Sequence, residues 1–136
     1  MMLKINCIQH IGMPVTDLEV SETFYGKLGF INVMASEFEY REGNGKVAMM
    51  RRGEMILELY QMPERELQEI RQRKDGRIDH IAFDVENIEE AFTTLKNASF
   101  SIVEAEPVFL PFWNDGCKYF NVLGPDNERL EFNQIL

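Results

Sequence analysis

The sequence repeats one pattern twice, with a shift of 70 residues between the copies. The runs IQHIGMPV (8–15) and IDHIAFDV (78–85) each place a histidine in an otherwise apolar, strand-like stretch, and these are the two histidines of the chain. An internal repeat predicts a fold built from two copies of one supersecondary unit. The shift pairs His10 with His80, Ile11 with Ile81, Val15 with Val85, Leu18 with Ile88 and Phe30 with Phe100.

Each copy continues from its histidine run into a helical pattern. Asp17 precedes the first pattern and Asn87 the second, and both residue types are favoured N-caps. The apolar spacing predicts one buried face on each helix. These predicted faces comprise Leu18, Phe24, Tyr25 and Leu28 in the first copy, and Ile88, Ala91, Phe92 and Leu95 in the second.

Three short strands are predicted after each helix, separated by glycine-rich and proline-containing turns at 42–45, 51–54 and 124–127. Each module therefore reads strand, helix, strand, strand, strand, which is an α+β pattern. We expect one domain, 1–136, of two modules at about 1–62 and 78–136, joined by the charged linker 63–77, for which a helix is one option. The predicted strands after the helices are 31–40, 46–52 and 55–61, then 100–106, 117–123 and 128–134.

The charge and composition exclude some classes of partner. The chain has 14 basic and 23 acidic residues and a net charge of −9, which opposes binding to nucleic acid or anionic membranes. No apolar run approaches the roughly 20 residues that cross a bilayer, and the N-terminus lacks a signal-peptide core. We therefore expect a cytoplasmic protein whose two cysteines, Cys7 and Cys117, are reduced.

Four polar side chains are candidate metal ligands. Glu58 and Glu131 alternate with apolar residues in the last strand of each module, so they point away from the apolar set. If the apolar sets pack under the helices, His10, His80 and both glutamates share the opposite face. A lone strand histidine is usually structural, and an alternating glutamate is usually solvated. Equivalent positions in both copies favour a divalent-metal site instead, since imidazole and carboxylate ligands suit first-row metals.

The sequence also resembles a known family at these residues. The histidine strand, the helix ending FYGKLGF, the LELYQ strand, DHIAFDV and the closing GPDNERLEF are similar to the vicinal oxygen chelate superfamily, above all to its small glyoxalase I type. This resemblance implies two βαβββ modules whose sheet curls into an open cup, the glyoxalase/bleomycin resistance/dioxygenase fold. It also implies that His10, Glu58, His80 and Glu131 are the complete ligand set for Ni, Co or Zn.

In glyoxalase I the substrate is the hemithioacetal of a thiol and a 2-oxoaldehyde, so the resemblance implies methylglyoxal detoxification by a lyase of lactoylglutathione lyase type. Proton transfer through a metal-bound enediolate gives a 2-hydroxyacyl thioester, with Glu131 or Glu58 as the base. We favour Glu131. The family's ring-cleaving dioxygenases use two histidines and one glutamate, and its acyl-CoA epimerases commonly carry glutamine where this chain has Glu58.

Two departures from the glutathione-using members put the thiol in doubt. Pro14 stands where those members carry an arginine, and Met62 where they commonly carry an asparagine, so two polar contacts for glutathione are lost. The alternatives to a glyoxalase are an acyl-CoA epimerase and a non-catalytic module that binds an antibiotic or another small molecule.

Four further residues are candidate substrate contacts: Arg129, Trp113, Tyr60 and Lys118. Arg129 and Tyr60 lie two residues from a predicted glutamate ligand and so share its face. Trp113 lies in the apolar loop 107–116, which is either a lid or part of a subunit interface. We expect a homodimer in which module one of one chain meets module two of the other, although the linker length also permits closure within one chain.

Overall fold

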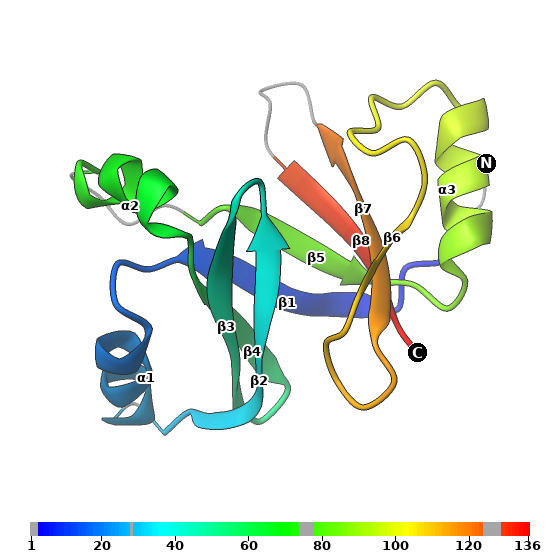
Figure 1. Ribbon diagram of the computed structural model, residues 1–136. Coiled ribbons are helices and arrows are strands. Elements are labelled where there is room, and N and C mark those ends of the chain that lie inside the picture. Colours follow the sequence, from blue (N-terminus) through cyan, green and yellow to red (C-terminus); the bar gives the residue numbers. More distant parts are fainter. Residues whose placement is uncertain (1–2, 28, 74–77, 124–128) are drawn as a thin grey trace. The chain divides into compact units, whose positions relative to one another are not determined.

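The computed structural model describes residues 3–27, 29–73, 78–123 and 129–136. The described residues form an α+β fold of eight strands and three helices (Figure 1). The elements in chain order are β1 (Cys7–Pro14), α1 (Leu18–Lys27), β2 (Ile31–Tyr40), β3 (Gly43–Arg52), β4 (Met55–Gln61), α2 (Glu64–Arg71), β5 (His80–Asp84), α3 (Ile88–Asn97), β6 (Val108–Leu110), β7 (Cys117–Leu123) and β8 (Arg129–Ile135).

The chain divides into two compact units, and both have the same topology. The first unit, His10–Asp79, has the strand order β2-β3-β4-β1, and the second unit, Met1–Gln9 with His80–Leu136, has the order β5-β8-β7-β6. The first strand of each module runs parallel to the last one, β1 with β4 and β5 with β8. The remaining pairs within each unit are antiparallel. The predicted pair of βαβββ modules is therefore confirmed.

The two helices α1 and α3 begin in the same way. Asp17 Oδ1 accepts a hydrogen bond from the Val20 amide at 3.1 Å, and Asn87 Oδ1 accepts one from the Glu90 amide at 3.1 Å. These contacts confirm both predicted N-caps. A glutamine from the last strand of each module provides a second acceptor. Gln61 Oε1 accepts a hydrogen bond from the Leu18 amide at 2.9 Å, and Gln134 Oε1 accepts one from the Ile88 amide at 3.0 Å.

Each helix covers one face of the sheet in its own unit. Helix α1 packs against β3 and β4, and α3 packs against β7 and β8. The buried clusters are Leu18, Ala48, Met50 and Leu59 in the first unit, and Val85, Ile88, Ala91, Leu95, Phe120, Val122 and Phe132 in the second. Apolar residues thus occupy the helix-facing side of each sheet, as predicted, and the alternating residues are directed to the other side.

Part of the strand prediction is wrong. The segment 100–106 forms no strand, and only Ile102 makes an isolated bridge, to Val122. The Glu104 carboxylate accepts the backbone amide of Asn121 at 2.6 Å, so a side chain takes the place of a ladder partner there. The first of the three strands after α3 is instead β6, inside the segment predicted to be a loop. Phe24 of α1 was predicted to be buried and is exposed. Leu28 and the turn 124–127 lie outside the described residues.

The linker contains a helix, α2, whose surface is rich in ion pairs. Arg71 and Glu64 form a pair at 2.6 Å, and the bonded guanidinium lowers the pKa of Glu64.

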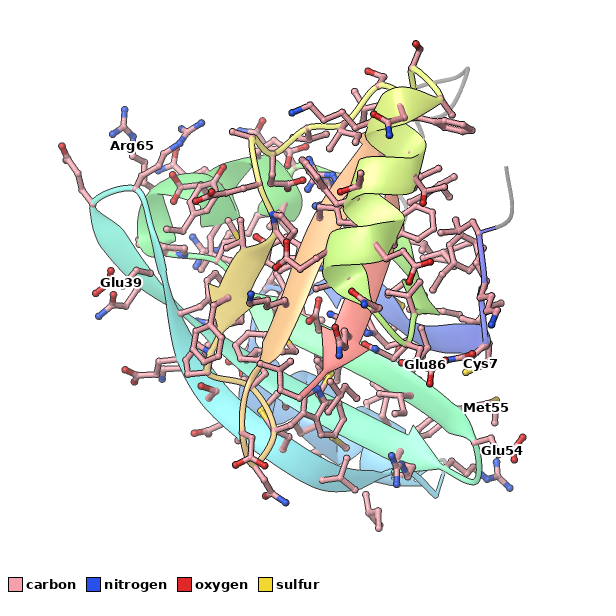
Figure 2. All side chains as sticks on the ribbon, turned by 90° about the vertical axis from the view of Figure 1, so that its right-hand side faces the viewer. Cys7, Glu39, Glu54, Met55, Arg65 and Glu86 are labelled. Carbon is pink, nitrogen blue, oxygen red and sulfur yellow. The ribbon has the colours of Figure 1, made fainter. Side chains whose placement is uncertain are left out.

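Among the described residues, no helix is long and apolar enough to span a membrane. Of the two cysteines, Cys117 is buried and Cys7 lies at the surface (Figure 2).

Candidate metal centre

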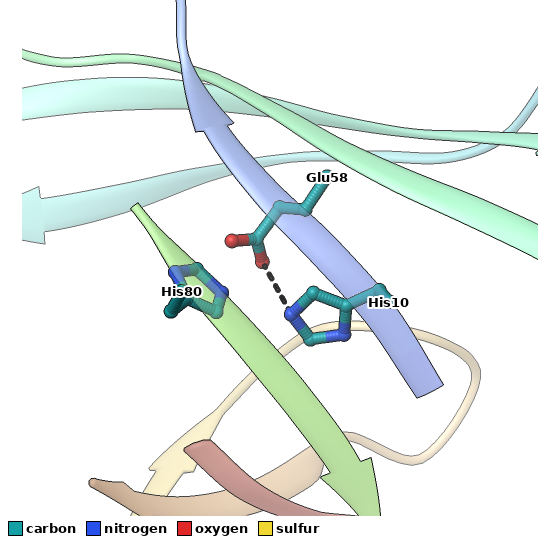
Figure 3. A group of neighbouring side chains, drawn as sticks. All are labelled: His10, Glu58 and His80. Atoms are coloured by element: carbon teal, nitrogen blue, oxygen red, sulfur yellow. Dashed lines mark ion pairs between the residues drawn. The ribbon is translucent and has the colours of Figure 1, made fainter. Parts of the chain in front are cut away.

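The first candidate ligand pair lies in the first unit. The parallel register sets Gly12 of β1 beside Glu58 of β4, and alternation places His10 on the same face as Gly12. His10 Nε2 is 3.8 Å from Glu58 Oε2, and the carboxylate is turned toward the imidazole ring (Figure 3). Both residues are buried, with exposed fractions of 1% for His10 and 9% for Glu58.

The second pair repeats this arrangement in the second unit. Ala82 of β5 lies beside Glu131 of β8, and His80 lies two residues before Ala82, on the same face. His80 Nε2 is 3.2 Å from Glu131 Oε2, and both residues are buried. Each compact unit therefore brings together one histidine and one glutamate from equivalent repeat positions.

Two asparagines flank Glu131. Asn133 Nδ2 donates a hydrogen bond to Glu131 Oε1 at 2.7 Å, and Asn121 lies directly across from Glu131 in the β7–β8 ladder. The Asn121 amide nitrogen donates to Glu104 Oε1 at 2.8 Å, which fixes the orientation of the amide, because the reverse one would set two oxygens together. Asn121 Oδ1 is then a buried acceptor with no partner among the described residues.

The neighbours of Glu58 are different. Met49 lies directly across from Glu58 in the β3–β4 ladder, at the position equivalent to Asn121. Tyr60 follows Glu58 by two residues, as Asn133 follows Glu131, and the Tyr60 ring packs edge-on against Phe38 with centroids 6.5 Å apart. The first pair therefore has an apolar and an aromatic neighbour where the second pair has two amides.

The four predicted substrate contacts lie in different surroundings. Arg129 is exposed and shares the His80 register position, and half-buried Tyr60 lies on the face of Glu58. Trp113 is half-buried, and its indole N–H has no partner among the described residues. Lys118 pairs with Glu89 of α3 at 2.9 Å, on the helix-facing side of β7, so the structure does not bring it to the face of Glu131.

Two residues near Glu131 were not predicted. The sequence does not show which residues of β7 point toward the helix. In the structure Phe120 packs in the core, so its neighbour Asn121 points to the other face, where it lies beside Glu131. Gln9 contacts Asn133 across 124 residues of sequence, and no local pattern signals such a contact.

The donors present suit a divalent ion. Two donors held about 2.1 Å from one ion at right angles lie about 3 Å apart, close to the separation in the His80–Glu131 pair. The unpartnered Asn121 Oδ1 across from Glu131 is the kind of acceptor that a ligand hydroxyl or water would satisfy. Imidazole and carboxylate groups together are typical ligands of zinc, nickel and cobalt.

Comparison with known proteins agrees with the fold and the repeat. The chain is 30% identical over 133 residues to the Bacillus subtilis protein YwbC, covering 93% of this chain and 96% of that one. It is similar to the solved structure of BH1468 from Bacillus halodurans, with a TM-score of 0.73, 25% identity, and 95% and 94% of the two chains covered. It also shares its fold with methylmalonyl-CoA epimerase from Mycobacterium tuberculosis, with a TM-score of 0.78, 16% identity, and 99% and 93% of the chains covered.

The family model covers both histidine strands and both helices of the repeat. The Glyoxalase/Bleomycin resistance protein/Dioxygenase superfamily model matches residues 9–119, which is most of the chain. The duplicated βαβββ topology supports the same assignment. This chain therefore belongs to the glyoxalase/bleomycin resistance protein/dioxygenase superfamily, the vicinal oxygen chelate proteins.

Proposed function

We propose that the two histidine–glutamate pairs hold one divalent ion, with His10, Glu58, His80 and Glu131 as its ligands. The observation that carries this proposal is the duplication: each unit sets a buried carboxylate against a buried imidazole at equivalent positions. Three of these residues, His10, Glu58 and His80, are also candidate ligands by the type of their side chains. Buried carboxylates need a compensating partner, and a cation supplies one.

The proposed reaction is proton transfer at a carbon next to a carbonyl group. When bound, the ion supplies a Lewis acid that stabilises negative charge on a substrate oxygen. Glu131 removes the carbon-bound proton, the electron pair of the broken C–H bond moves toward the carbonyl oxygen, and the proton then returns to carbon. Glu131 is the favoured base because the Asn133 amide orients its carboxylate by binding Oε1, while Met49 lies opposite Glu58.

The leading substrate class is the hemithioacetal of a small thiol and a 2-oxoaldehyde. In this class Glu131 returns the proton to the neighbouring carbon, which gives a 2-hydroxyacyl thioester, the glyoxalase I outcome. The carboxylate at position 58 supports this class, because a second anionic ligand offsets the charge of a divalent ion. A cytoplasmic location, methylglyoxal detoxification and a homodimer stay predictions that belong with this proposal.

A second candidate is an acyl-CoA epimerase, in which the proton returns to the opposite face of the same carbon. The likeness to methylmalonyl-CoA epimerase over nearly the whole chain favours this candidate. Glu58 weighs against it.

Metal analysis and two assays test these candidates. Protein purified from medium supplemented with Ni(II), Co(II) and Zn(II) should contain close to one equivalent of metal by elemental analysis. It should then isomerise hemithioacetals formed from methylglyoxal and glutathione, cysteine or coenzyme A. Exchange of the α-proton of a 2-methylacyl-CoA in heavy water, without hemithioacetal turnover, would support the epimerase instead. Protein that takes up no metal and gains no thermal stability from these ions would contradict both enzymes and favour a non-catalytic binding module.

A further inference from the structure

A chain of hydrogen bonds leads to Glu131 within the second unit. The Gln9 amide nitrogen donates to Asp84 Oδ1 and to Asn133 Oδ1, both at 3.1 Å. Asn133 Nδ2 in turn donates to Glu131 Oε1 at 2.7 Å. The other oxygen of this carboxylate, Oε2, faces His80 at 3.2 Å. The two oxygens of Glu131 therefore have different partners.

The direction of every bond in this chain is fixed by chemistry. Asp84 offers only acceptor oxygens when ionised, and Asn6 Nδ2 already donates to its Oδ2 at 2.8 Å. Gln9 must therefore turn its NH₂ group toward Asp84, and the same nitrogen faces the Asn133 side chain. Asn133 then has to present its oxygen to Gln9 and its nitrogen to Glu131.

The hydrogen-bonded residues nearest to Glu131 are buried, as is Glu131 itself. The exposed fractions are 6% for Gln9, 3% for Asn133 and 8% for Glu131. A buried hydrogen bond to a charged group is stronger than one between neutral groups and is not readily exchanged for water. Asn133 Nδ2 also lies 3.9 Å from Cys117 Sγ, so both of its hydrogens have acceptors nearby. The Asn133 amide is therefore held in one orientation.

We infer that Asn133, oriented by Gln9, is a positioning residue that holds Glu131 Oε1 and presents Oε2 to the divalent ion. This inference rests on the proposed metal site and deepens it. Asn133 does not touch the ion or the reacting carbon; it acts through the carboxylate. The position equivalent to Asn133 in the first module carries Tyr60, so the first module has no amide side chain at this position.

Cobalt(II) titration, followed by the visible absorption of the bound ion, tests the inference without relying on turnover. Asn133→Ala should weaken Co(II) binding by about 10- to 100-fold, the usual range for residues that support a metal ligand. Gln9→Met, which keeps the side-chain length and removes the donor, should weaken it by a smaller factor. Gln134→Ala is the matched control: it lies on the same strand but caps α3, so it should leave the affinity unchanged.

A double-mutant cycle separates positioning from a general structural effect. In a Glu131→Ala background, Asn133→Ala should cause no further loss of affinity. An equal loss with and without Glu131, or wild-type affinity in both Asn133→Ala and Gln9→Met, would overturn the inference while leaving the metal site in place. Wild-type protein that binds no Co(II) would overturn the metal site and the inference together. If Asn133→Ala does not fold, as judged by circular dichroism, the Gln9→Met cycle decides.

Discussion

The two histidine–glutamate pairs occupy equivalent positions of one repeated topology, yet their surroundings differ. Glu58 has Met49 across the ladder, whereas Glu131 has Asn121 across the ladder and a hydrogen bond from Asn133. The backbone that carries the pairs is duplicated down to the helix caps. The difference indicates that the fold was kept symmetric while the chemistry around the two carboxylates was not. We interpret Glu58 as a ligand that balances charge and Glu131 as the group that moves a proton.

Removal of either histidine should have the largest effect, because it destroys one of the two histidine–glutamate pairs. His10→Ala or His80→Ala should lose metal and activity, because the substituted unit then has one donor fewer for the ion. The core-facing residues of β1 and β5 are untouched, so the circular dichroism spectrum should stay that of wild type. Elemental analysis and the gain in melting temperature on adding Zn(II) provide the measurement. Unchanged metal content in either variant would make that histidine structural.

The two carboxylates should respond differently to the same substitution. Glu131→Gln should lower kcat by about 10²–10⁴-fold, because an amide cannot accept the proton. Glu58→Gln should act mainly on metal affinity and should retain measurable kcat at saturating metal. Steady-state kinetics at several metal concentrations separates the two effects. If Glu58→Gln abolishes kcat with metal bound while Glu131→Gln does not, the assignment of the base is reversed.

A mixing experiment tests whether the two pairs meet across subunits. If module one of one chain meets module two of its partner, a His10→Ala chain and a His80→Ala chain form one intact and one doubly damaged site per heterodimer. Random exchange of equal amounts should then restore about a quarter of the wild-type activity. Differently tagged chains allow the heterodimers to be isolated by affinity purification. Inactive heterodimers would show that each site is built within a single chain.

The repeat in the sequence predicts the fold and the two histidine–glutamate pairs because both depend on local patterns. Alternation places His10 opposite Met13 and Val15, and Glu131 opposite Phe132, and these apolar residues do pack under the helices. What the sequence does not reveal depends on contacts between distant residues. The Gln9 side chain donates to Asn133, and the Glu104 carboxylate accepts the backbone amide of Asn121. Each of these contacts replaces a regular backbone bond or crosses the repeat, so neither periodicity nor residue spacing could indicate it.

The smallest effect is expected at the helix caps. Substituting them tests whether the two modules, which share one topology, are also equally stable. Asp17→Ala and Asn87→Ala each remove one exposed acceptor from the first turn of a helix, at the same distance of 3.1 Å. Each should lower the free energy of unfolding of the metal-free protein by about 1 kcal/mol. The two losses should agree within a few tenths of a kcal/mol in urea titrations, and Co(II) affinity should not change, because the caps lie outside both pairs.

Two threonines within the same helices serve as controls for these caps. Thr23 donates its hydroxyl back to the Glu19 carbonyl in α1, and Thr93 is exposed in α3, so alanine at either position should be neutral or slightly stabilising. A much larger loss in one capped module than in the other would show that the scaffold itself is asymmetric. The difference between Glu58 and Glu131 would then need an explanation in the stability of their modules, in addition to their immediate neighbours.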